Sequence, residues 1–236
     1  MPVKLPDTVT RRVAVILGTS GSGQQLLDFL QPLLGKDTEI NLQGVFIEDD
    51  ALQRTAALPF KELCRLTLSV REIHSDQFER TIALQTRTAR RAIAGLAQRM
   101  GVSHTFRKVR GSTISLLLET AHSADITIFE PLRIFAASPI APRLHTSQPK
   151  QRIVVAIDDP ATLDRLISDL LPTAPARILL SPGSEIKNLI ATVRAERADM
   201  LVLGTSEKLL KPESLRLLME QLRCPICLVR QWDSRI

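Results

Sequence analysis

Arg12-Val13-Ala14-Val15-Ile16-Leu17 and Arg152-Ile153-Val154-Val155-Ala156-Ile157 are two short apolar runs that open similar segments about 140 residues apart. The first run reaches Gly18 and the second reaches Asp158. Each then leads through an apolar-periodic stretch to a proline, Pro32 or Pro172, at the same distance from its arginine. An unbroken apolar run that ends at a turn residue is typical of a strand buried on both faces. The two runs therefore predict two related strand–helix openings.

A second pair of similar segments follows these openings. Gly111-Ser112-Thr113-Ile114 begins a stretch that ends in Ala124-Asp125-Ile126-Thr127-Ile128. Gly183-Ser184-Glu185-Ile186 begins another, which ends in Ala198-Asp199-Met200-Leu201-Val202. Ordered matches of this kind indicate an internal duplication. Because strands that alternate with helices form parallel sheets with right-handed crossovers, we expect an α/β fold built from two Rossmann-like units.

Hydrophobic periodicity predicts a strand–helix series in each half. In the first half we expect strands at 13–17, 40–47, 102–109 and 125–129, and helices at 24–34, 76–100 and 111–122. Asp76 is the expected N-cap of the long helix. In the second half we expect strands at 153–157, 177–180, 200–203 and 226–229, and helices at 162–171, 185–197 and 213–222. Residues 51–75 stay unassigned because Pro59 interrupts any helix there.

The two units are incomplete in different places. The first, residues 1–135, lacks a final helix and strand after Phe129, whereas the second, residues 151–236, lacks a strand and the long helix. Residues 136–150, with Pro139, Pro142 and Pro149, form the expected linker. Because neither unit is complete, we expect them to pack as one body with a pseudo-twofold relation.

The composition limits the class of protein. Aromatic residues make up only 3% of the 236 residues, so the core must be built from Leu, Ile, Val and Ala, which suits parallel sheets covered by helices. No apolar run approaches the roughly 20 residues of a membrane span, and the N-terminus lacks the apolar core of a signal peptide. Three cysteines provide no disulfide framework. We therefore expect a cytoplasmic protein without membrane insertion.

The C-terminal stretch 198–230 carries the clearest likeness to a known family. It has Ala-Asp before an apolar strand that ends in Gly204, and it closes with Cys224-Pro225-Ile226-Cys227-Leu228-Val229-Arg230. With the strand–helix layout and the Gly-Ser helix starts, the chain resembles the universal stress protein family in tandem form. The resemblance implies five-stranded parallel sheets, a role in stress adaptation, and dimerisation through the last strands. Some members bind ATP or AMP, and others bind no nucleotide.

Nucleotide-binding members of that family carry an Asp after the first strand. After the fourth strand they carry Gly-x-x-Gly, a nine-residue gap and Gly-Ser/Thr. Asp158 and Gly204 match two of these positions, but Glu207 and Leu217 stand where the later glycines should be. In the first unit, Phe129-Glu130-Pro131 contains no glycine. Because the backbone cannot approach a phosphate closely without those glycines, the resemblance predicts that ATP binding of the family type is lost, with no cofactor.

One loop offers another place for an anion. It lies between the first strand and the next helix, where backbone N–H groups and the helix dipole favour negative charge, and it comprises Gly18, Thr19, Ser20, Gly21, Ser22 and Gly23. It is not a P-loop, because Gln24 and Gln25 replace the Lys and Ser/Thr, and Leu26 replaces the third glycine of a dinucleotide fingerprint. The alternative interpretation is an ordinary strand–helix turn.

Three further groups of residues are candidate sites. Cys224 and Cys227 lead into a strand that would point them to opposite faces, and the four histidines are scattered, so we expect a buried pair without redox or metal chemistry. The acidic clusters Glu48-Asp49-Asp50 and Asp158-Asp159 follow strands, where they can bind a cation, position a ribose or cap helices. The arginine-rich stretch 80–110 favours a solvated face over nucleic-acid binding, because stacking aromatics are scarce.

These observations support two main hypotheses. The first is a non-enzymatic, universal-stress-like binding or interaction module with an unknown protein partner. The second is a protein that binds or hydrolyses adenine nucleotides through the Gly18–Gly23 loop. Beyond that loop, the residues considered for a small ligand are Gly111, Ser112, Asp158, Gly183, Ser184, Gly204, Thr205 and Ser206. Strand 226–229 is expected at a sheet edge, where it would pair with a second copy in a homodimer.

Overall fold

The protein is described by a computed structural model that covers residues 10–18, 26, 27, 30, 39–50, 54, 60–64, 69–73, 75–131, 151–157, 163, 176–180, 185–204 and 211–230. The expected linker 136–150 lies outside these residues. Of the expected helices 24–34 and 162–171, only Leu26, Leu27, Leu30 and Leu163 are described, all in helical conformation.

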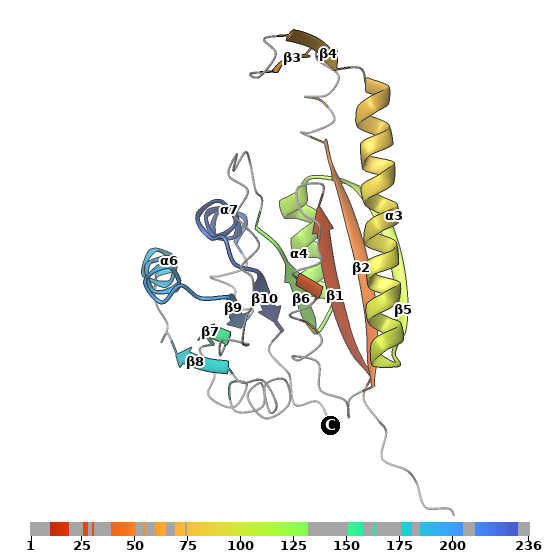
Figure 1. The fold of residues 1–236 in the computed structure, drawn as a ribbon. Helices are drawn as coiled ribbons and strands as arrows, with labels where there is room; N and C mark the ends of the chain where they lie inside the picture. Colours follow the sequence, from red (N-terminus) through yellow and green to blue (C-terminus); the bar gives the residue numbers. More distant parts are fainter. Residues whose placement is uncertain are drawn as a thin grey trace, which may run out of the picture.

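The first half of the chain contains four strands of the main sheet, a hairpin and two helices. The strands are β1 (Arg11–Gly18), β2 (Ile40–Asp49), β5 (Ser103–Gly111) and β6 (Ile126–Phe129). The helices are α3 (Ser75–Met100) and α4 (Thr113–Ser123). The unassigned stretch 51–75 contains an antiparallel hairpin, β3 (Phe60–Cys64) and β4 (Ser69–Ile73), which lies beyond the end of the main sheet (Figure 1). Because α3 begins at Ser75, Asp76 lies in its first turn and is not the N-cap that we expected.

The second half supplies four more strands and two described helices. The strands are β7 (Gln151–Ala156), β8 (Ala176–Leu180), β9 (Met200–Gly204) and β10 (Ile226–Val229). The helices are α6 (Ile186–Ala195) and α7 (Pro212–Gln221). In the described part of the chain, no helix combines the length and apolarity needed to cross a membrane.

All eight of these strands form one sheet, in the order β5-β2-β1-β6-β10-β9-β7-β8. Strands from the first half pair in parallel with one another, as do strands from the second half. Among the described strands of this sheet, the one antiparallel pairing joins the halves, with Ile226 opposite Phe129 and Val229 opposite Ile126. The α/β class and the parallel pairing within each half are therefore confirmed. The pseudo-twofold relation stays a prediction, because no described strand of the first half corresponds to β10.

The expectation that strand 226–229 is a sheet edge is wrong. β10 is paired on both sides, with β9 in parallel and with β6 in antiparallel orientation. Its backbone groups are therefore used within the chain, and it has no free edge through which to pair with a second copy. The edges of the eight-stranded sheet are β5 and β8.

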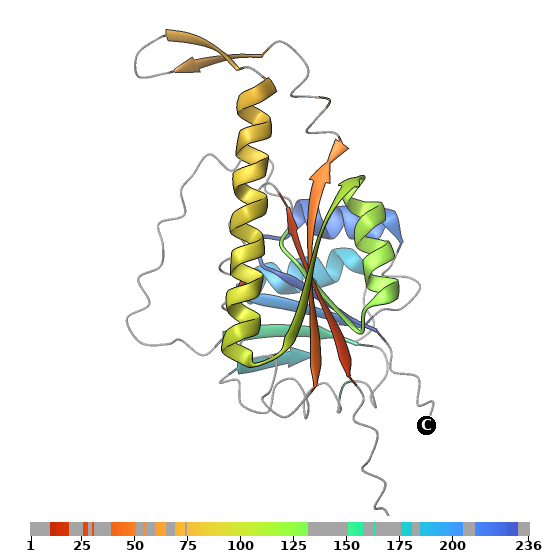
Figure 2. The same cartoon turned by 90° about the vertical axis from the view of Figure 1, so that its right-hand side faces the viewer.

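Each face of the sheet has its own apolar core. On one face, α3 packs Ile82, Ile93 and Leu96 against strand residues such as Val13 and Phe46. On the other face, α4, α6 and α7 pack Leu117, Leu189 and Leu215 against residues such as Ile16 and Leu201. Figure 2 shows α3 and α4 on opposite sides of the sheet, with β1, β2 and β5 upright and the second-half strands running across them. This rotation is the accumulated twist of adjacent strands.

The same Arg–Asp contact occurs in both halves of the chain. The backbone N–H of Arg12 donates to Asp125 Oδ2 at 2.9 Å, and that of Arg152 donates to Asp199 Oδ2 at 3.0 Å. In return, the N–H groups of Asp125 and Asp199 donate to the carbonyl oxygens of Arg12 and Arg152. Both halves therefore fix the register of their first strand against their Ala-Asp strand in the same way.

Gly44 in β2 allows α3 to approach the sheet closely. A Cβ atom at this position would lie 2.8 Å from Phe106 Cδ2 and 2.9 Å from Ile93 Cγ1. The first neighbour belongs to β5 and the second to α3, and Ile93 is fully buried. The lack of a side chain at Gly44 is therefore a packing requirement of this core.

We expect Gly44→Ala to destabilise the protein by about 1–3 kcal/mol, because the added methyl group overpacks the contact with Ile93 and Phe106. Gly95→Ala is the matched control in α3, where the new Cβ would meet only Arg99 Nη1 at 3.7 Å. That change should stabilise the protein by about 0.5–1 kcal/mol through helix propensity. Thermal unfolding followed by circular dichroism measures both effects, and changes of the same sign would contradict this account.

Candidate functional site

The sheet topology separates the candidate ligand-binding residues into two groups. Ligands of parallel α/β sheets bind beyond the carboxyl ends of the strands. Because the strands of the two halves run in opposite directions, their carboxyl ends lie at opposite ends of the sheet. Gly18, Asp49 and Gly111 end strands of the first half, and Gly204 ends β9 of the second half. The two groups therefore do not form one shared site.

Several sequence-predicted site residues fall outside the described part of the chain. Gly18 ends β1 opposite Ile47 of β2, but the rest of its loop is not described. The candidates that lie outside the described residues are Thr19, Ser20, Gly21, Ser22, Gly23, Asp158, Gly183, Ser184, Thr205 and Ser206. Anion binding by the Gly18–Gly23 loop therefore stays a prediction.

The acidic cluster at the end of β2, Glu48-Asp49-Asp50, contacts groups from β5 and α4. Lys108 Nζ lies 2.8 Å from Glu48 Oε2, and Arg110 Nε lies 3.0 Å from Asp50 Oδ1. The first pair joins β5 to β2, the second joins β5 to the residue that follows β2, and the Glu48 side chain is only 11% exposed. Within the described residues, no group of three His, Cys, Asp or Glu side chains is placed to hold a metal ion. This arrangement favours a role for the carboxylates in holding β2 and β5 together.

Asp49 places a negative charge at the beginning of α4. Thr113, the first residue of the helix, donates from Oγ1 to Asp49 Oδ2 at 2.5 Å. Ser112 is the N-cap residue, but its side chain makes no capping hydrogen bond. A carboxylate near a helix N-terminus is stabilised by the helix dipole, as a bound anion would be. The chain therefore supplies its own anion beside Gly111 and Ser112.

Two of the described candidate glycines, Gly111 and Gly204, have structural roles. Gly111 has φ +153°, a backbone conformation that favours glycine, and a Cβ there would lie 3.4 Å from Leu116 Cδ1. At the end of β9, a Cβ on Gly204 would lie 3.3 Å from Ile157 Cγ2. Gly204 also stands opposite Val229 in the β9–β10 register. Backbone geometry and packing explain both glycines without a ligand.

Sequence reasoning missed the ion pair between Arg230 and Asp125. Arg230 Nη2 lies 2.8 Å from Asp125 Oδ1, and Arg230 Nη1 donates to the His122 carbonyl oxygen at 3.2 Å. The backbone N–H of Arg230 also donates to the Asp125 carbonyl oxygen. Asp125 thus contacts the beginning of β1 and the end of β10 at once. The repeated Ala-Asp was a visible signal, but only the topology identifies Arg230 as its partner.

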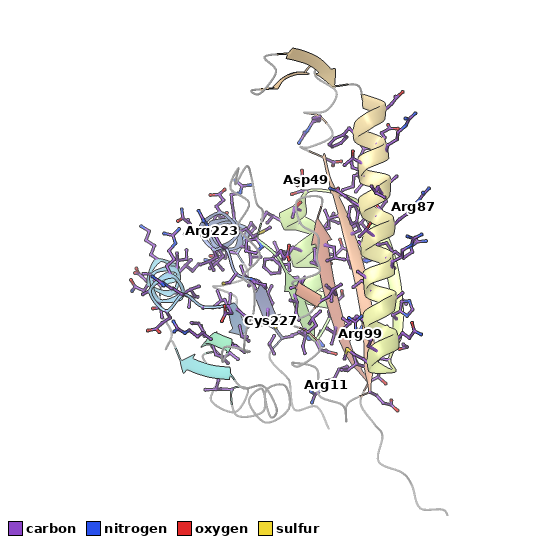
Figure 3. The ribbon with its side chains drawn as sticks, viewed as in Figure 1. Arg11, Asp49, Arg87, Arg99, Arg223 and Cys227 are labelled. Carbon is purple, nitrogen blue, oxygen red and sulfur yellow. The ribbon has the colours of Figure 1, made fainter. Side chains whose placement is uncertain are left out.

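The arginine-rich stretch divides into a paired part and an exposed part. On β5, Lys108 and Arg110 are in ion pairs, and Arg107 Nη2 donates to Thr120 Oγ1 of α4 at 3.4 Å. The arginines of α3 are exposed, namely Arg80, Arg87, Arg90, Arg91 and Arg99. Arg90 lies over the Phe106 ring, 5.1 Å from its centroid. Figure 3 shows Arg87 directed away from the sheet.

The two C-terminal cysteines are free, buried and separated by the sheet. Cys224 belongs to the core beneath α4, α6 and α7, and Cys227 belongs to the core beneath α3. Burial raises the pKa of the Cys224 thiol to about 11 and that of Cys227 to about 12. The thiolate is the reactive form of cysteine and the form that binds metals. The prediction that these residues face opposite sides of the sheet is confirmed.

In a Cys64→Ser variant, we expect native Cys224 and Cys227 to react with a thiol reagent at pH 8 at least about 100-fold more slowly than in the unfolded chain. The raised pKa of Cys224, about 11 instead of 9.0, accounts for about 100-fold through its smaller thiolate fraction, and burial adds to it. Mass spectrometry after timed labelling in buffer and in urea measures both rates. Rapid labelling of the folded protein would contradict the buried arrangement.

Comparisons with known proteins gave structural matches alone. The chain matches no protein-family model and no curated protein sequence. Among solved structures it is similar to a universal stress protein from Archaeoglobus fulgidus DSM 4304, with 9% identity and a TM-score of 0.40 over 94% of this chain and 97% of the other. It is also similar to a protein of unknown function from Pseudomonas aeruginosa PAO1, with 10% identity and a TM-score of 0.39 over 93% and 92%.

A third similar structure is assigned to the universal stress proteins and comes from Pseudomonas aeruginosa UCBPP-PA14. It shares 10% identity with this chain and has a TM-score of 0.39, covering 93% of each chain. At these TM-scores the similarities carry no argument about a ligand, an activity or a partner. The chain is thus similar to solved universal stress proteins over more than nine-tenths of its length.

Proposed function

We propose that this protein is a non-enzymatic interaction module of the universal-stress type, which acts in the cytoplasm during stress adaptation and does not bind ATP in the family manner. The main support for this proposal is the position of Leu217. It stands where the last glycine of the nucleotide pattern should be, inside α7, and its side chain packs against the core. A backbone N–H in the middle of a helix is already hydrogen-bonded within the helix, so residue 217 offers no donor to a phosphate.

The charges at the carboxyl ends of the first-half strands support the same proposal. Asp49 already places a carboxylate at the beginning of α4, where a phosphate would bring like charge against it. The neighbouring cations Lys108 and Arg110 have carboxylate partners and are not left for a phosphate. A triphosphate bound at these strand ends would therefore have to displace the existing contacts of Asp49, Lys108 and Arg110.

The described residues also give little support to catalysis. The two described thiols are buried with raised pKa values, which keeps them protonated and weakly nucleophilic near neutral pH. Free thiols of this kind suit a reducing compartment, which supports the cytoplasmic proposal. Interaction with another macromolecule is the remaining role that we propose.

We expect ATP, ADP and AMP at millimolar concentration, with and without Mg²⁺, to leave the thermal unfolding midpoint unchanged within about 1 °C. A nucleotide present at 100 times its Kd would add about 2.7 kcal/mol of stability and raise the midpoint of a chain of this size by roughly 5–10 °C. Differential scanning fluorimetry measures the shift. A Mg²⁺-dependent rise that Gly21→Val or Gly23→Val removes would overturn the proposal in favour of nucleotide binding by the Gly18–Gly23 loop.

A further inference from the structure

The outward side of α3 combines exposed arginines with one exposed leucine. Leu84 is 65% exposed, and among the described residues it is the one large apolar side chain that is exposed. Arg80 precedes it by four residues, and Arg87 and Arg91 follow it by three and seven. These spacings place the four side chains on one side of a helix, opposite the buried Ile82, Ala89 and Ile93. We call Arg80, Leu84, Arg87 and Arg91 the arginine stripe.

The arginine stripe is not balanced by acidic residues of its own helix. The acidic residues of α3, Asp76 and Glu79, lie at its beginning, and the sequence from Arg80 to Met100 contains no other. Arg80, Arg87 and Arg91 make no ion pair with another residue in the described part of the chain. On β5, by contrast, Lys108 and Arg110 do have carboxylate partners. A surface of this kind is complementary to an acidic one.

The spacing within the stripe suits a helical partner. Leu84, Arg87 and Arg91 are separated by three and then four residues, and the same alternation continues to Ala94 and Gln98. Positions that alternate by three and four residues share one side of a helix, so a second helix packed alongside α3 would contact all of them. Leu84 is the apolar contact on this side, and the arginines can pair with carboxylates on the facing helix.

We propose that the arginine stripe is a docking surface for an acidic amphipathic helix of a partner protein, an inference that rests on the proposed role as an interaction module. A second copy of this chain is a poor occupant, because arginines would face arginines. Nucleic acid is also a poor occupant. It gains nothing from Leu84, and the nearest aromatics, Phe78 and Phe106, pack against the core and cannot stack on bases.

The test uses a fluorescein-labelled synthetic peptide of about three heptads, with leucine at the a and d positions and glutamate at e and g. Fluorescence anisotropy with the full-length protein should show micromolar binding that weakens as NaCl is raised. Arg87→Glu/Arg91→Glu should weaken binding at least about tenfold, and Leu84→Ser about threefold or more. A peptide with glutamine in place of glutamate should bind at least about tenfold more weakly than the acidic peptide.

The matched control is Arg216→Glu/Arg223→Glu, which reverses the charge of two exposed arginines, one in α7 and one just after it, and so changes the net charge by the same amount. Figure 3 places Arg223 and Arg87 on opposite sides of the molecule. The control loses as much net charge as the stripe variant, and it should bind the peptide within about twofold of the parent protein at a salt concentration that screens long-range attraction. Unchanged unfolding midpoints establish that all variants are folded.

Four results would overturn the inference: no binding of the acidic peptide, equal binding of the glutamine peptide, equal weakening by the control variant, or tighter binding of a duplex DNA of similar length. None of them depends on the nucleotide assay. A protein that shows neither an ATP shift nor peptide binding would therefore lose this inference alone, whereas an ATP shift would remove the proposed function beneath it.

Discussion

The antiparallel pairing of β6 with β10 is the constraint on which the rest of the structure depends. It joins four parallel strands from each half into one sheet, and the ion pair of Arg230 with Asp125 closes the end of the junction. The pairing uses the backbone groups of β10 that would otherwise form an open edge. It also makes the strands of the second half run opposite to those of the first, so the carboxyl ends of the two sets of strands lie at opposite ends of the sheet. One pairing therefore decides both how the halves are joined and where their candidate sites lie.

The local structure could be read from the sequence because its signals are local. Unbroken apolar runs predicted β1 and β7, and the periodicity from Asp76 to Met100 predicted α3 to within one residue at its start. The repeated Ala-Asp marked two aspartates that make the same backbone contacts in both halves. The opposite orientations of Cys224 and Cys227 followed from the alternation of side chains along an extended chain.

The most consequential wrong prediction concerns a contact between residues far apart in the sequence. β10 was expected at an edge because nothing in its four residues specifies pairing with β6, almost 100 positions earlier. The hairpin of β3 and β4 was missed because Pro59 and irregular apolar spacing hid its alternation. For the candidate site, glycines at 111 and 204 carry the same signal whether they make room for a phosphate or for a neighbouring side chain. Only the positions of Leu116, Ile157 and Asp49 separate these two explanations.

The most direct measurement of the shared sheet is a disulfide across the junction. Ile128 stands opposite Cys227 in the β6–β10 register, and both side chains belong to the core beneath α3. In a Cys64→Ser/Cys224→Ser background, Ile128→Cys should form an intramolecular disulfide with Cys227 when the unfolded chain is refolded under oxidising conditions, detected by mass spectrometry without reductant. Ile126→Cys, whose register partner is Val229, should form it far less. A chain that stays reduced, or that links only to a second chain, would contradict the pairing of β10 with β6 within one molecule.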